Sequence, residues 1–226
     1  FEHVPENTET KQESTQNFDK AFHEIEMVLK VFQIYRGDVG YVQGMSQLGF
    51  IIYHVFNDEF LTFEYFVFLI LKKYPLFEFF SFDNKTVSSF SKCVSHFCKS
   101  HVKDPSETVS FFLENMVGTY LYSVFFTCFV GFFEESDIFL ILDLFAVQNF
   151  HVLTFLSIVV VILYSREKPQ NFNLSNLKAF TKKKGLESVF REAARLSFKL
   201  EDLVKYWESE NDEDLGGLTE SDESFR

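Results

Sequence analysis

Apolar and polar residues are spaced along this chain with the period of an α-helix. Large apolar side chains recur every three or four residues from Phe18 to Tyr35, which predicts a helix with one apolar face that ends near Arg36. The glycine-containing segment 37–40 then breaks the helical pattern. The polar segment 1–16 has no such repeat, and we expect it to be an exposed linker.

The helical repeat continues to about Trp207. Asp104 followed by Pro105 is typical of a helix start, because an N-cap carboxylate and a first-turn proline both suit a helix N-terminus. Further helices are predicted at about 42–56, 59–74, 105–115, 120–133, 136–147 and 151–164, with one after Asn84 and two between Leu174 and Trp207. No alternating run is long enough for a sheet. We therefore predict an all-α helical domain over 17–207, built from the parts 17–116 and 117–207.

Two uncharged stretches raise the question of membrane insertion. Val117–Phe133 is at the short limit for a spanning helix, and Ile138–Tyr164 contains the carboxylate of Asp143, which is costly in hydrocarbon. A buried helical core is the favoured interpretation, and a membrane-inserted helical hairpin is the alternative. The last segment, 208–226, is rich in acidic residues, and we expect it to be disordered.

Composition narrows the possible partners. The formal net charge of −12 argues against a nucleic-acid partner and disfavours anionic membranes, since both need a positive surface. Three cysteines are too few for a disulfide framework, which favours the cytosol. The chain starts at Phe1 rather than Met, so we expect it to be a piece of a longer polypeptide.

Common site patterns are mostly absent from the sequence. It has no phosphate-binding loop of the G-x-x-x-x-G-K-[ST] or G-x-G-x-x-G type and no H-E-x-x-H zinc helix. Cys93, His96, Cys98 and His101 are possible zinc ligands, but on one helix they spread over a broad arc and do not converge on one ion. We therefore predict no metal site and no cofactor of the protein's own.

The segment from Arg36 to Met45 differs from the rest, because glycines flank a polar side chain at a helix start. Gly37 and Gly40 permit unusual backbone angles, and Gln43 lies where the first amide groups of a helix favour negative charge. The segment could therefore contact a phosphate of a partner.

Two parts of the chain resemble the TBC domain, a helical module that acts on Rab-type GTPases. Tyr41, Gln43, Gly44 and Met45 match the Tyr-x-Gln-Gly-Met motif of that family. Downstream, Phe125-Phe126-Thr127-Cys128-Phe129 and Leu140-Ile141-Leu142-Asp143 are similar to its aromatic and Arg-Ile-Trp-Asp stretches. Asp143 is kept there, whereas Leu140 and Leu142 replace the arginine and the tryptophan. The likeness covers about 18–166 and implies a multi-helix bundle of two helical subdomains.

The resemblance implies a GTPase activator that hydrolyses nothing itself. Gln43 would orient the attacking water in the partner, to which GTP and Mg²⁺ belong, while the residues Gly40, Tyr41, Gly44 and Met45 would contact that partner. Phe126 and Asp143 would be structural, and we expect Asp143 to cap or hydrogen-bond a neighbouring helix. The family's second catalytic group, an arginine, is expected at or before Phe1.

The alternative is a Rab-binding module of the same fold without catalysis, because the arginine is not found and the downstream motif is altered. Tyr41 and Met45 could also simply pack the base of the helix. Either function implies a cytoplasmic protein in vesicle trafficking, recruited to endomembranes through its partner.

Overall fold

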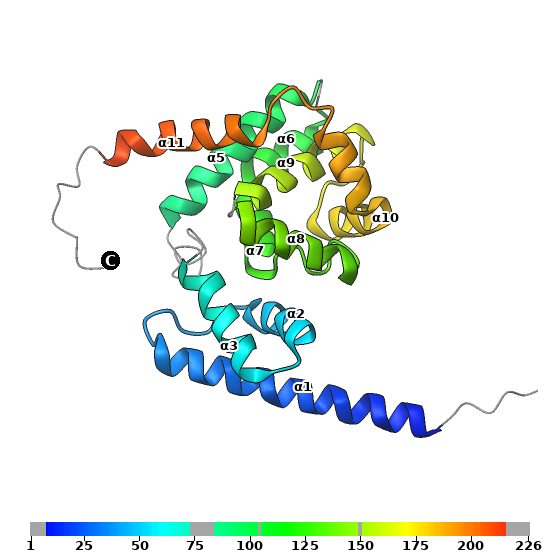
Figure 1. Ribbon diagram of the computed structural model, residues 1–226. Helices are drawn as coiled ribbons and strands as arrows, with labels where there is room; N and C mark the ends of the chain where they lie inside the picture. The colour runs from blue at the N-terminus through cyan, green and yellow to red at the C-terminus, as the bar shows by residue number, and fades with distance from the viewer. Residues whose placement is uncertain (1–7, 73–83, 104, 149–150, 216–226) are drawn as a thin grey trace, which may run out of the picture. The chain divides into compact units, whose positions relative to one another are not determined.

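A computed structural model describes residues 8–72, 84–103, 105–148 and 151–215 (Figure 1). In this part of the chain every named element is helical, and the only strand-like feature is an isolated bridge between Val130 and Phe133. The predicted all-α fold is therefore confirmed. Two compact units are present, Phe1–Lys72 and Lys73–Arg226. This division falls earlier than the expected one after residue 116, because the helix that starts at Asn84 packs against helices of the second unit.

The first unit is built from three helices that contact one another pairwise: α1 (Thr8–Tyr35), α2 (Met45–Phe56) and α3 (Glu59–Val67), which continues into one π-helical turn, η1 (Phe68–Lys72). Phe32 and Phe66 are fully buried and meet edge to face, with ring centroids 5.2 Å apart. Between α2 and α3, Asn57 adopts a left-handed conformation, and the carboxylate of Asp58 accepts a hydrogen bond of 2.8 Å from the Leu61 amide. The chain therefore reverses where the sequence predicts.

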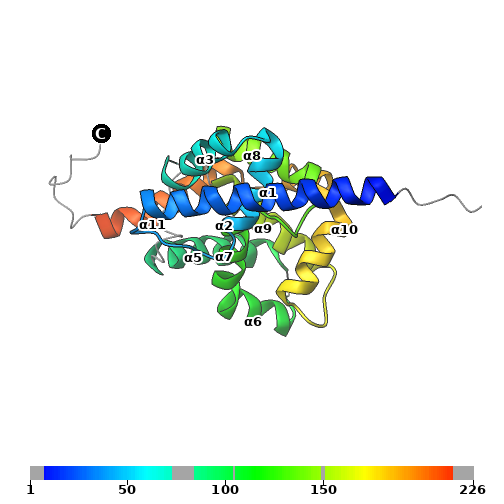
Figure 2. The same ribbon diagram turned by 90° about the horizontal axis from the view of Figure 1, so that it is seen from below.

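Helix α1 begins at Thr8, inside the segment that was expected to be a linker up to residue 16. It extends past α2 and α3 at its N-terminal end in both views (Figures 1 and 2). Its first turns contain Glu, Lys and Gln, which are good helix formers, so the helix can continue without an apolar face to bury. The expectation of a linker was wrong for this reason.

The second unit contains seven described α-helices, with α9 at the centre. They are α5 (Asn84–His101), α6 (Glu107–Asn115), α7 (Val117–Thr127), α8 (Glu135–Gln148), α9 (His151–Arg166), α10 (Leu174–Ala193) and α11 (Leu200–Leu215). Helix α9 contacts α5, α7, α8, α10 and α11, and 13 of its 16 residues are buried. A helix that is apolar on all sides belongs in a core, as the sequence predicts. None of the described helices has the length and apolar character needed to cross a membrane.

Two boundaries in the second unit differ from expectation. Helix α6 starts after Ser106 rather than after Asp104, which lies outside the described residues. Helix α7 ends at Thr127, not near Phe133, because Cys128 and Phe129 both adopt positive φ angles and turn the chain. These two residues are fully buried, and Phe129 contacts the ring of Phe132, so the turn is part of the core.

Helix α10 is broken at Gly185, whose φ of 73° and ψ of 162° are not helical. The amide of the next residue, Leu186, donates a hydrogen bond of 3.2 Å to the carboxylate of Asp137 on α8. Asp137 thus satisfies an amide that the break leaves without a helical partner. The break lets both halves of α10 lie against α9.

Helix α11 is held mainly by aromatic contacts. Trp207 stacks on Phe90 with ring centroids 5.7 Å apart, and Tyr206 stacks on His96 at 4.4 Å. The helix continues to Leu215, so the expectation of disorder from residue 208 was wrong as far as that residue, and 216–226 lie outside the described part.

Replacing Lys168 with glycine is expected to stabilise the fold by about 0.5–1 kcal/mol. Lys168 is exposed after α9 and has a φ of 49°, which costs an L-residue more than it costs glycine, although glycine also loses more entropy on folding. Urea unfolding measures the difference. Lys205→Gly, in the middle of α11, serves as the control and should destabilise by about 1 kcal/mol. Destabilisation by Lys168→Gly would contradict the assigned backbone conformation.

Lowering the pH from 7.5 to 5 is expected to cost about 2 kcal/mol of folding free energy through His151 alone. Burial at the start of α9 lowers the pKa of this imidazole from its ordinary 6.5 to about 4. The unfolded chain takes up a proton below pH 6.5 while the folded chain does not, so the stabilisation is complete above that pH and is lost towards pH 4. Urea titrations at both pH values should show a smaller loss for His151→Phe, and an equal loss in both proteins would refute the assignment.

Candidate functional site

The segment between α1 and α2 is anchored at its start by a local ion pair. Arg36 donates two hydrogen bonds to the carboxylate of Asp38, of 2.8 and 2.6 Å, and these bonds hold the pKa of the Asp38 carboxyl below its ordinary value. The amide of Val39 donates to the carbonyl of Arg36 at 3.0 Å. Gly40 follows with a φ of 68° and with no atom close to where a Cβ would lie, so its backbone angle is what favours glycine.

Residues 42–45 form a tight turn that presents Gln43. The Met45 amide donates to the Val42 carbonyl at 3.1 Å, and Gly44 occupies the third position of the turn with a φ of 113°. A turn of this kind requires a positive φ at its third position, which glycine supplies. Gln43 occupies the second position, at the corner, and is exposed. A single side-chain amide therefore projects from a turn with a defined backbone.

Buried neighbours hold this turn on both sides of Gln43. Val42 is 3% exposed, Met45 is fully buried, and the Val42 amide lies 3.4 Å from the Met45 sulfur, a weak acceptor. Burial supports the interpretation that Met45 packs the base of the helix. Gly44 is also buried, so within this motif only Gln43 and Tyr41 are exposed.

Gln43 lies before α2 rather than in its first turn. The first helical residue is Met45 and the N-cap is Gly44, which offers no side chain to the helix amides. The first turn of α2 also contains no acidic residue. The positive end of this helix, which begins two residues after Gln43, is therefore not neutralised by a side chain of α2 itself.

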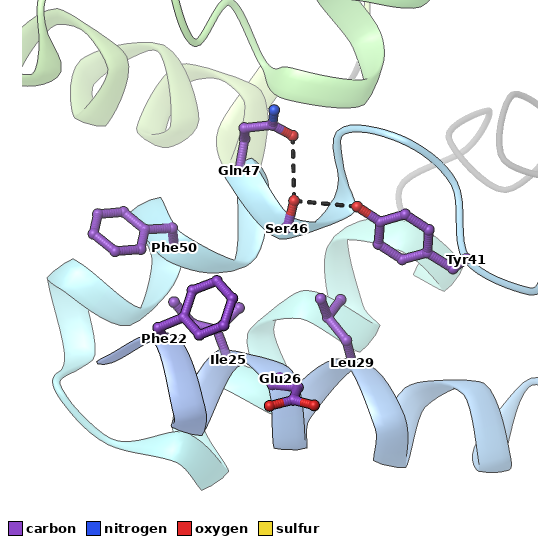
Figure 3. Close-up of a pocket in the computed structure, with 8 residues that line it drawn as sticks. All are labelled: Phe22, Ile25, Glu26, Leu29, Tyr41, Ser46, Gln47 and Phe50. Atoms are coloured by element: carbon purple, nitrogen blue, oxygen red, sulfur yellow. Dashed lines mark hydrogen bonds between the residues drawn. The ribbon is translucent and has the colours of Figure 1, made fainter. Parts of the chain in front are cut away.

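A pocket of about 310 Å³ opens between α1 and α2 beside the turn (Figure 3). Tyr41, half exposed, donates to or accepts from the Ser46 hydroxyl at 3.2 Å, and Ser46 donates to the Gln47 side chain at 3.5 Å. The other lining residues come from both helices and are mostly apolar: Phe22, Ile25, Glu26, Leu29 and Phe50.

Sequence reasoning did not identify the pocket, because helical spacing assigns Phe22 to the buried face of α1. In the structure Phe22 is 63% exposed and lines the open pocket between α1 and α2. No pattern in the sequence marks Ser46 or Gln47 as pocket residues.

The downstream motif residues belong to the second unit, whereas the Gln43 turn belongs to the first. Phe126 on α7 is buried and its ring lies 5.2 Å from that of Tyr122. Asp143 is exposed on α8, and its carboxylate has no hydrogen bond or ion pair with any described residue, so the expected bond to a neighbouring helix is wrong. Leu140 is 46% exposed and Leu142 is buried.

The cysteines and histidines of α5 are engaged in packing and hydrogen bonding within the second unit. Cys93 and Cys98 are buried, His96 stacks on Tyr206, and His101 shares a hydrogen bond of 2.9 Å with Ser197. Burial raises the pKa of the Cys98 thiol, which disfavours the nucleophilic thiolate. Within the described residues, no three His, Cys, Asp or Glu side chains are grouped as metal ligands.

Comparison with known proteins gives one match. The family model described as the Rab-GTPase-TBC domain matches residues 4–170, which include the Gln43 turn, the pocket and the helices up to α9. No curated protein and no solved structure matches the chain significantly.

Proposed function

The chain belongs to the Rab-GTPase-TBC domain family, and on this basis we propose that it activates GTP hydrolysis by a Rab-type small GTPase, with Gln43 as the glutamine supplied in trans. The observation that carries this proposal is the corner position of Gln43. Its amide is exposed, while the residues around it in the turn, Val42, Gly44 and Met45, are buried.

A glutamine at such a corner suits the hydrolysis step chemically. Its carbonyl oxygen can accept a hydrogen bond from the attacking water, and its NH₂ group can donate to the charge that develops on the transferred phosphoryl group. A neutral amide does not remove the proton itself, so its contribution is to hold the water in line with the phosphorus. GTP and Mg²⁺ are supplied by the GTPase in this scheme.

The surroundings of Gln43 favour a protein partner over a small substrate. The adjacent pocket is lined mostly by apolar side chains, with Phe22 and Tyr41 exposed at its sides. Exposed apolar surface of this kind is typical of interaction sites. We assign Tyr41 and Gly40 to contact with the GTPase, whereas Gly44 and Met45 act by holding the turn.

The second candidate is a Rab-binding module without catalytic activity. Leu140 favours it, because an exposed leucine stands where the family resemblance places an arginine. The arginine expected at or before Phe1 would provide the second catalytic group under the first candidate, and such fingers contribute about 10³ to 10⁵ in rate. Binding without acceleration is what the second candidate predicts.

Single-turnover GTP hydrolysis by a panel of Rab-type GTPases separates the two candidates. The full natural polypeptide and the 226-residue chain are each added in excess, and binding to the GTP-loaded GTPase is measured in parallel. Acceleration of at least one GTPase supports activation. Binding with no acceleration by the full polypeptide refutes activation and supports the binding module, and no binding to any GTPase refutes both.

The proposed function also implies a location. A protein that acts on Rab-type GTPases would work in vesicle trafficking, in the cytoplasm or peripherally on endomembranes. Fluorescence microscopy of the tagged protein, with and without its GTPase, would check this assignment.

A further inference from the structure

Positive charge is concentrated in one short part of this acidic chain. Residues 166–199 contain nine Lys and Arg and three Glu, a formal net charge of +6, whereas the total of −12 leaves −18 on the other 192 residues. We call these nine cations the α10 basic surface: Arg166, Lys168, Lys178, Lys182, Lys183, Lys184, Arg191, Arg195 and Lys199. The negative net charge of the whole protein therefore does not show that one segment is positively charged.

Ion pairs bring part of this surface together around the C-terminal end of α9. Lys184, before the break in α10, lies 2.9 Å from the carboxylate of Glu167. After the break, Glu192 is paired with Arg166 and lies 3.9 Å from Arg195. Lys184 in the first half of α10 and Arg195 just after α10 are therefore both close to the end of α9, which contributes Arg166 itself.

The nearby carboxylates do not neutralise this surface. Lys182 is paired with Glu134 at 3.3 Å and Arg191 with Glu187 at 2.6 Å. All four side chains are more than half exposed, and such pairs are weak and screened by salt. Lys168 and Lys183 are exposed and have no ion pair with a described residue, and Lys178 lies over the ring of Phe132. Eight of the nine cations are exposed, so the positive charge faces solvent.

Local stabilisation explains only some of these residues. Cations at the end of α9 interact favourably with the helix dipole, which accounts for Arg166 and Lys168. Lys183 lies in the first half of α10 and has no ion pair or cation–π contact with a described residue. Most of the surface also lies beyond residue 170, where the family match ends, and none of it lies in the Gln43 turn or the adjacent pocket, to which the proposed function is assigned.

We propose that the α10 basic surface binds an anionic lipid membrane. A membrane presents diffuse negative charge that exposed cations can meet without a shaped pocket, and each Lys or Arg close to it adds to the binding. Single-stranded nucleic acid is the less suitable polyanion, because it is bound through exposed aromatic side chains as well as cations. Among side chains described after Val147, no large hydrophobic one is exposed.

The test is sedimentation of the protein with vesicles of phosphatidylcholine containing 30 mol% phosphatidylserine, at low and high salt. The variant carries Lys→Gln at Lys168, Lys182, Lys183 and Lys184. The control variant carries Lys→Gln at Lys20, Lys30, Lys99 and Lys205, which are exposed and lie outside the surface, so both variants have the same net charge. Glutamine keeps helix propensity, and circular dichroism confirms that both variants fold.

We expect the wild-type protein to bind these vesicles and to be released by salt. The affinity of the variant for the vesicles should fall by about tenfold or more. The affinity of the control variant should stay within about threefold of wild type. The proposal is overturned if the wild-type protein does not bind, if vesicles of phosphatidylcholine alone bind it equally, or if the control variant loses as much. Binding to single-stranded RNA but not to the vesicles would also overturn it. None of these outcomes depends on GTPase activation.

Discussion

Replacing Gln43 with alanine is expected to lower the single-turnover rate of GTP hydrolysis at saturating activator by about 100-fold, the scale of losing one hydrogen-bonding group that acts in a transition state. Affinity for the GTP-loaded GTPase should stay within about threefold, because only one exposed side chain is shortened. Stability should be unchanged, since Gln43 contributes nothing to the buried part of the turn. Rapid-quench measurement of hydrolysis, with binding measured separately, gives both quantities.

Two further variants make the Gln43 experiment specific. Gln33→Ala removes another exposed glutamine, on α1 and away from the pocket, and should leave rate and affinity as in the wild type. Gln43→Asn keeps the amide but shortens its reach by one methylene, and its rate should also fall. If the GTPase hydrolyses GTP as fast with Gln43→Ala as with the wild-type activator, the assigned role of Gln43 is wrong even where activation itself is observed.

Replacing Gly44 with alanine is expected to destabilise the first unit by about 2 kcal/mol and to lower activation as well. Gly44 has a φ of 113°, a conformation that L-residues adopt at a cost of about 1–3 kcal/mol. Relief of that strain would change the turn and move the Gln43 amide. Urea unfolding and single-turnover hydrolysis together measure both effects.

The other glycines near Gly44 provide a graded control. Gly37 has no positive φ, and an added Cβ would lie 3.5 Å from the Gln33 carbonyl, an ordinary contact, so Gly37→Ala should be close to neutral. Gly40 has a φ of 68° with open space around it, and Gly40→Ala should cost about 1 kcal/mol. Equal effects at all three positions would show that the turn does not depend on positive φ angles.

The sequence predicts those parts of the fold that depend on local signals. Asn57 and Asp58 mark a helix end and a helix start, and both act in those roles in the structure. The apolar stretch that contains α9 is the centre of the second unit, because apolar residues on every side of a helix require contacts on every side.

Features that depend on tertiary context were not predictable in this way. The polar start of α1 has no apolar face to mark it, and helical spacing alone assigns Phe22 to the core although it lines an open pocket. The bond between Asp137 and Leu186 joins residues 49 positions apart, so no local pattern could indicate it. In contrast, the motif alone makes Gln43 a candidate, whereas its position at a turn corner depends on the backbone of Gly44.

The arrangement of the Gln43 turn has a consequence for the evolution of such proteins. Folding depends on the buried Val42, Gly44 and Met45, whereas Gln43 can be exchanged without disturbing them. A single substitution at this corner could therefore lower the activation rate strongly in a descendant that still folds and still recognises its GTPase. Under the proposed function, selection for activity would preserve the glutamine, and selection for structure would preserve the residues beside it. Descendants that retain Gly-Met but lose the glutamine would compete with active relatives for the same GTPase.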